Sequence, residues 1–190
     1  NFSVNAVIAS NVPLGSGLSS SAALEVAMAT FLERLCNITH VPKVTKALRC
    51  QTAEHTFADT PCGIMDQFIS AMGEKDHLLL IDCQSHTHTL VPYGTAQVNK
   101  PVLLVTNSHV KHSLGDSAYA TRVAECRNAL DIIRETYPTV SSYRDVTVEQ
   151  LQAMQKRLPP VLYQRALHVV TENDRTLRTV EALKKNDFVA

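Results

Sequence analysis

Two glycines and three consecutive serines lie close together near the N-terminus, within the segment NVPLGSGLSSSAALEVA at residues 11–27. Gly15 and Gly17 allow the backbone to turn and to approach a ligand without interference from a Cβ atom. The serines fall where we expect a helix to begin, and free N–H groups and the helix dipole favour an anion there. Serine hydroxyls also donate hydrogen bonds to phosphate oxygens. The segment therefore has the composition of a phosphate-binding loop.

A flexible linker and a plain helix cap are the other interpretations of this segment. The linker is disfavoured because Pro13, Leu14 and the residues after the serines are apolar and favour burial. A cap explains one serine but not three, and the Glu or Gln of a capping box is absent. The segment is neither GxxxxGK[ST] nor a complete GxGxxG, because Ser20 holds the last glycine position. A cap and a phosphate loop both remain open from composition alone.

Two acidic residues are candidates to act with such a loop, because nucleotide chemistry requires oxygen ligands for Mg²⁺ and a base for the acceptor. Asp66, in CGIMDQF, has the apolar neighbours Ile64, Met65 and Phe68. Its carboxylate is therefore paired, functional or exposed at a loop edge. Glu54, in CQTAEHTF, falls within an expected helix, where a solvent-facing side chain is the ordinary alternative to a functional one.

The pattern of apolar residues predicts an α+β protein. We expect helices over residues 20–35, 42–57, 65–72, 117–136, 148–155 and 161–185, and strands over residues 4–10, 77–82 and 101–107. The mixed first half gives way to helices near residues 108–116. We therefore expect one domain over residues 1–110 and a mostly helical one over residues 111–190.

The overall composition narrows the classes of partner. The chain has 190 residues, 45% apolar and 19% charged, as in ordinary globular proteins. Its formal net charge is zero, and no basic cluster is present, so neither nucleic acid nor a membrane surface is expected as a partner. No apolar run approaches the roughly 18 residues of a membrane span. The five cysteines are scattered and lack CxxC spacing, which indicates reduced thiols and a cytoplasmic protein.

Several segments, in the same order, resemble motifs of the GHMP small-molecule kinases, and among these the galactokinases of animals. They are PLGSGLSSSAALEVA, AEHTF, PCGIMDQF, LLLIDC, TNSHVKHSLGDSAYATRVAEC and RALHVVTEN. The resemblance covers nearly the whole chain and is loosest over residues 91–100 and 137–160. It implies a two-domain GHMP kinase-like fold, with the remainder of the N-terminal domain at residues 1–110 and the start of the C-terminal domain at residues 111–190.

The resemblance also implies an activity, which is transfer of the γ-phosphoryl group of ATP to the 1-hydroxyl of α-D-galactose with Mg²⁺ as cofactor. Ser21 and Glu54 match the positions that bind Mg²⁺, and Asp66 matches the general base beside the anomeric hydroxyl. Gly63 and Tyr119 match positions that contact galactose. The residues that match the loop around the ATP phosphates are Gly15, Ser16, Gly17, Leu18, Ser19, Ser20 and Ser21.

Two motifs of the family are missing from the chain. These are the GRVNLIGEHTDY-type signature, expected before Asn1, and the glycine-rich GGGFGG-type motif, expected after Ala190. We therefore expect a fold that is incomplete at both ends, and we expect the isolated 190 residues to lack galactokinase activity. A related N-acetylgalactosamine kinase is the nearest alternative, which the sequence Cys62-Gly63-Ile64 disfavours. A sugar-binding regulator without catalysis is the other, which the intact serine loop and Asp66 disfavour.

Overall fold

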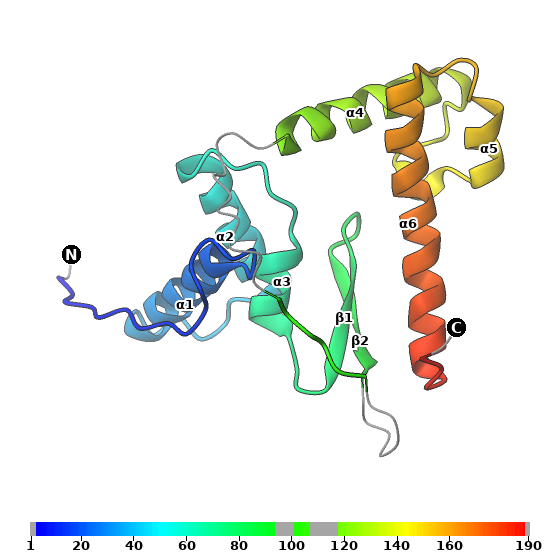
Figure 1. The fold of residues 1–190 in the computed structure, drawn as a ribbon. Helices are drawn as coiled ribbons and strands as arrows, with labels where there is room; N and C mark the ends of the chain where they lie inside the picture. Colours follow the sequence, from blue (N-terminus) through cyan, green and yellow to red (C-terminus); the bar gives the residue numbers. More distant parts are fainter. Residues whose placement is uncertain (1–2, 94–100, 107–117, 189–190) are drawn as a thin grey trace. The chain divides into compact units, whose positions relative to one another are not determined.

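The computed structural model describes residues 3–93, 101–106 and 118–188. The chain forms two compact units, of which the first takes in the chain up to Leu90 and the second the chain from residue 117 on, with the intervening segments divided between them. Figure 1 shows the elements of each unit along the chain. None of the described helices is long and apolar enough to cross a membrane.

The first unit consists of three helices and a hairpin (Figure 1). Its helices are α1 (Ser20–Leu35), α2 (Lys43–Phe57) and α3 (Met65–Met72), and each packs against the other two. Strands β1 (His77–Asp82) and β2 (Thr87–Pro92) form a two-stranded sheet after α3.

The core of this unit lies between α2, α3 and β1. Phe68 on α3 is fully buried and packs with Ala47, Ile64 and Met72, while Leu79 of β1 lies against the same cluster. Burial of such apolar side chains is the main force that holds the three helices together. The core therefore fixes α3, the helix that begins next to Asp66, against α2.

The second unit consists of α4 (Tyr119–Thr136), α5 (Val148–Ala153) and the long α6 (Pro160–Lys184), with a short 3-10 helix at Tyr143–Asp145. Local sequence explains two of the helix starts. Thr147 and Gln150 form a capping box at α5, and a proline occupies the first turn of α6. The buried core residues of this unit are Ala129, Ile133, Val140, Val146, Leu151, Met154, Leu158, Ala166 and Val170.

Two polar contacts add to this core. The hydroxyl of Tyr143 donates a hydrogen bond to the Cys126 carbonyl oxygen at 2.6 Å. Burial raises the pKa of the Tyr143 phenol, so it remains a hydrogen-bond donor at neutral pH. Arg165 on α6 makes an ion pair with Glu125 on α4, with 2.7 Å between Nε and Oε2.

The α+β class is confirmed, and the expected helices and the strand over residues 77–82 are present within a few residues of their expected bounds. The prediction of a strand over residues 4–10 is wrong. The prediction of a strand over residues 101–107 is wrong for residues 101–106, and residue 107 lies outside the described residues. A strand needs a hydrogen-bonded neighbour, and none of the described residues pairs with these segments, whose Val7 and Leu104 are 98% and 87% exposed. The expected domain boundary after residue 110 also lies outside the described residues and stays a prediction.

Replacement of Leu151 by alanine tests the core of the second unit. Leu151 is fully buried, so Leu151→Ala leaves a cavity and is expected to lower the free energy of unfolding by about 2–5 kcal/mol. Leu177→Ala on α6 is the matched control, because Leu177 is 59% exposed. Its expected effect is within about 0.5 kcal/mol. Urea unfolding followed by circular dichroism measures both, and equal losses would contradict this assignment of the core.

Candidate active site

The glycines of the serine loop have backbone conformations that other residues rarely adopt. Gly15 has a φ of +65° and Gly17 a φ of +75°. No atom lies within 4 Å of the position that a Cβ would take at either residue. Glycine is therefore favoured here by the backbone conformation and not by packing. The space beside the loop backbone is open to a ligand.

The loop leads directly into the N-terminus of α1. Ser19, at the N-cap, has a φ of +57°, and its side chain makes no capping hydrogen bond. The capping interpretation is therefore wrong for Ser19. Because the first N–H groups of a helix have no partner within the helix, an uncapped N-terminus next to a glycine loop favours an anion.

Glu54 on α2 is buried, with 6% of its surface exposed, so the solvent-facing alternative is wrong. Its Oε2 atom accepts a hydrogen bond from Nε2 of Gln67 at 2.7 Å and one from the Cys62 thiol at 3.5 Å. Among the described residues no lysine or arginine forms an ion pair with Glu54. A buried carboxylate without a cationic partner is destabilised, because hydrogen bonds from neutral donors replace its lost hydration only in part.

Glu25 on α1 is a second carboxylate at this place, and the sequence analysis missed it. Its Oε2 atom accepts a hydrogen bond from the same Nε2 of Gln67 at 3.1 Å. Glu25 lies four residues after Ser21, so the two residues share one face of α1. That spacing, together with the position of Gln67 directly after Asp66, was the signal available in the sequence.

The electrostatics of the cluster of Glu25, Glu54, Cys62 and Gln67 favour a cation. Burial raises the pKa of Glu25, and the neighbouring Glu54 raises it further, while the hydrogen bond from Gln67 acts in the opposite direction. Burial and then Glu54 raise the pKa of the Cys62 thiol to about 11, so the thiol is uncharged at neutral pH.

These residues fit Mg²⁺. Two close carboxylates that repel each other are stabilised by a divalent cation, and the hydroxyl of Ser21 on the same face of α1 is a further oxygen donor. Within the part of the chain that the structure describes, no group of three or more His, Cys, Asp or Glu residues forms a metal cage. Mg²⁺ does not require one, because it commonly binds through one or two carboxylates together with nucleotide phosphates.

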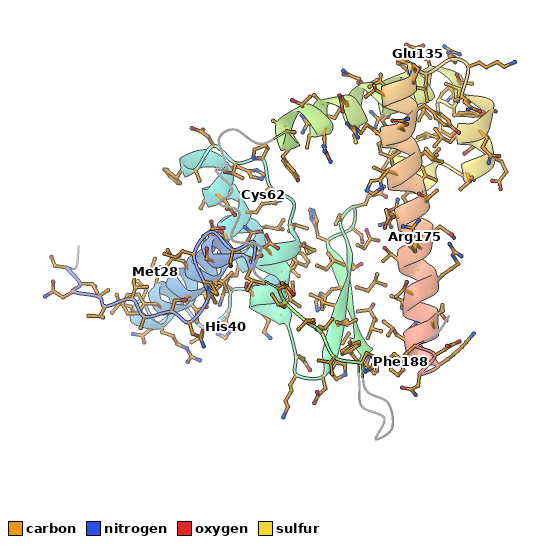
Figure 2. All side chains as sticks on the ribbon, in the orientation of Figure 1. Met28, His40, Cys62, Glu135, Arg175 and Phe188 are labelled. Carbon is orange, nitrogen blue, oxygen red and sulfur yellow. The ribbon has the colours of Figure 1, made fainter. Side chains whose placement is uncertain are left out.

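Asp66 and Gly63 lie on the chain between α2 and the first turn of α3. Asp66 is half-buried, and none of the described residues forms a hydrogen bond or ion pair with its carboxylate. Gly63 is exposed and follows Cys62, which Figure 2 labels. The segment between α2 and α3 is held by Gln51, whose Nε2 donates a hydrogen bond to the Cys62 carbonyl oxygen at 3.1 Å.

Tyr119, the other expected sugar contact, belongs to the second unit. It is the first residue of α4, is 45% exposed, and lines a cavity of about 710 Å³ together with Arg122, Tyr143 and His168. In the first unit the serine loop leads into α1, Glu54 lies on α2 and Asp66 lies on α3, and these three helices pack against one another. Tyr119 is not part of this group of helices.

Comparison with known proteins identifies the class. Residues 2–74 match the family model described as GHMP kinases N terminal domain. The first unit therefore contains a segment that is similar to the N-terminal domain of the GHMP kinases.

Galactokinases are the relatives of this chain within that class. It is 45% identical over 186 residues to the galactokinase of Homo sapiens, an alignment that covers 98% of this chain and 45% of the human protein. It is 44% identical to the galactokinase of Roseiflexus sp. (strain RS-1), with 96% of this chain and 45% of that protein covered. Among solved structures, Lactococcus lactis galactokinase complexed with galactose matches with a TM-score of 0.76 and 30% identity, over 90% of this chain and 43% of that chain. The chain is a galactokinase homologue and spans about half the length of the curated relatives that it matches.

The reactivity of Cys62 tests the electrostatics of the site without any substrate. Because Glu54 contributes to the raised pKa of Cys62, Glu54→Gln is expected to lower that pKa and to speed alkylation of Cys62 by iodoacetamide at pH 8–9. Peptide mass spectrometry measures the rate at each cysteine. Cys126 in the second unit, where burial also raises the pKa of the thiol, is the internal control. Its alkylation rate should not change. An unchanged Cys62 rate would contradict the contact with Glu54.

Proposed function

We propose that this chain supplies the phosphate loop, the metal ligands and the base of an ATP-dependent galactokinase, which converts α-D-galactose to galactose 1-phosphate. The observation that carries the proposal is the packing of α1, α2 and α3, which carry the serine loop, Glu54 and Asp66 respectively. Homology to galactokinases along 98% of the chain supports galactose as the acceptor.

In this proposal the loop over residues 15–21 binds the phosphates of ATP. The left-handed conformations of Gly15 and Gly17 let its backbone curve, and the uncapped start of α1 presents N–H groups to the phosphate oxygens. Ser19 and Ser20 donate from their hydroxyls. These donors hold the γ-phosphoryl group in place and stabilise the negative charge on its oxygens during transfer.

Ser21 and Glu54 hold Mg²⁺ in the proposed site. When bound, Mg²⁺ neutralises charge on the phosphates and so favours departure of ADP. Glu54 is suited to this role because it is buried and has no cationic protein partner among the described residues.

Asp66 is the proposed general base. Its carboxylate accepts the proton of the 1-hydroxyl of galactose as that oxygen forms its bond to the γ-phosphorus and the bond to the ADP oxygen breaks. No hydrogen bond or ion pair with another described side chain occupies the carboxylate, so it is available to a substrate hydroxyl. Gly63, close to Asp66 along the chain, and Tyr119 are the proposed sugar contacts.

We place this activity in the cytoplasm, with galactose and ATP as partners and with neither nucleic acid nor a membrane. The support for this placement is chemical. Each of the five cysteines is a free thiol in the structure, and the chain has zero formal net charge.

Galactose-dependent release of ADP by the full-length protein tests the proposal. We expect turnover with ATP, Mg²⁺ and galactose, and little with N-acetylgalactosamine. Turnover that prefers N-acetylgalactosamine would assign the alternative sugar kinase. Galactose binding without ADP release would assign a regulator and would overturn the proposal.

Replacement of Asp66 by asparagine tests the base. Asp66→Asn keeps the size of the side chain but removes its ability to accept the proton, so kcat is expected to fall by about 10²–10⁴-fold. The Kd for ATP, measured by calorimetry, should change little. Asp59→Asn is the control, because Asp59 is exposed and its φ of +49° suits asparagine. Normal turnover in Asp66→Asn would refute this role.

A further inference from the structure

The side-chain amide of Gln67 is an unusual feature of the first unit. Gln67 is fully buried, and its Nε2 atom donates to Glu54 at 2.7 Å and to Glu25 at 3.1 Å. Its Oε1 atom is buried and has no hydrogen-bond partner among the described residues. A single amide from α3 thus joins carboxylates on α1 and α2.

The orientation of this amide is set by its neighbours. A flipped amide would place Oε1 against two carboxylates, which have no proton to donate when they are ionised. An unpaired buried oxygen is destabilising, so the amide gives up a hydrogen bond at Oε1 and in return uses its N–H groups on the carboxylates. In this arrangement both carboxylates receive a hydrogen bond, while Oε1 of Gln67 is left without one.

We propose that Gln67 is a positioning residue, which holds the carboxylates of Glu54 and Glu25 together and thereby orients Glu54 toward Mg²⁺. The inference rests on the proposed function for the role of Glu54. Gln67 adjoins Asp66 on α3, and Glu25 shares a face of α1 with Ser21. The amide therefore connects Glu54, a proposed Mg²⁺ ligand, with the helices that carry the other ligand, Ser21, and the proposed base, Asp66.

Loss of this amide has a defined physical consequence. The buried Glu54 carboxylate and the half-buried Glu25 carboxylate repel each other when they share no donor, and Glu54 is then free to adopt other rotamers. Partners that orient a metal ligand typically change metal affinity or activity by about 10–100-fold when they are removed. We therefore expect weaker binding of the metal and the nucleotide, and little change in the binding of the sugar.

Gln67→Met, which keeps the length of the side chain without its donors, tests the inference in the full-length protein. Mn²⁺ in the presence of ATP is the probe, and electron paramagnetic resonance measures its binding without turnover. We expect the affinity for Mn²⁺ to fall by about 10-fold or more and the KM for Mg·ATP to rise, with the KM for galactose changed less than about two-fold. Wild-type values for Mn²⁺ and Mg·ATP would overturn the inference.

Gln51→Met is the matched control. Gln51 lies on α2 of the same unit and donates to the Cys62 carbonyl oxygen, not to a carboxylate. The substitution removes a comparable hydrogen bond, so a general loss of stability would appear in both variants. The affinity for Mn²⁺ should be unchanged in Gln51→Met, and an equal fall in both variants would overturn the inference.

A double variant tests whether Gln67 acts through a donor. In Glu25→Gln with Gln67→Met, the new amide at position 25 is placed to donate to Glu54, so the affinity for Mn²⁺ should recover in part relative to Gln67→Met. No recovery would count against the role of the donor. If Gln67→Met does not fold, Gln67→Asn keeps the amide on a shorter side chain that cannot reach both carboxylates, and wild-type affinity there would overturn the inference.

The two proposals fail in distinguishable ways. Absence of galactose turnover in the wild-type protein would refute the proposed function, whereas binding of Mn²⁺ with ATP would still report whether Gln67 orients Glu54. Normal turnover in the wild type, with unchanged Mn²⁺ affinity in Gln67→Met, would refute the positioning role alone.

Discussion

The hydrogen bonds between one buried amide and two carboxylates organise the first unit around its chemistry. Gln67 on α3 donates to Glu54 on α2 and to Glu25 on α1, so the three residues come from three different helices. Burial makes these charges costly, and the amide offsets that cost only in part because it is neutral. The remaining negative charge would be stabilised by a cation. Local instability of this kind is typical of sites where polar groups are arranged for function and not for maximal stability.

Apolar packing keeps these polar groups in place. Phe68 follows Gln67 on α3 and is buried in the core with Ala47 of α2. Successive residues of one short helix thus supply the proposed base, the amide and the core anchor. The second unit has its own core around Ile133 and Leu151, so each unit has an independent source of stability. The similarity to the galactokinase of Homo sapiens covers 98% of the chain and so includes both units.

Helices were predicted well from sequence, whereas the strand over residues 77–82 is present and the strands expected over residues 4–10 and 101–106 are not. The segments that form α1, α2 and α6 carry their helix signals locally, because helical hydrogen bonds lie within the segment. The β-branched run at residues 4–10 is a sheet-forming sequence, but no described strand pairs with it. The hairpin strand β2 has a weaker pattern, yet it forms because β1 lies beside it. Strand formation depends on a partner that the segment itself does not encode.

The sequence by itself supplied the resemblance to GHMP kinases and the candidate site residues of the serine loop, Glu54 and Asp66, because motif order and residue type are read directly along the chain. Only the tertiary structure decided that Glu54 is buried and that Gln67 joins it to Glu25. These facts arise from the packing of α1, α2 and α3, which brings residues 42 positions apart within hydrogen-bonding distance. Burial and hydrogen-bond partners are properties of such packing, and spacing along one helix does not specify them.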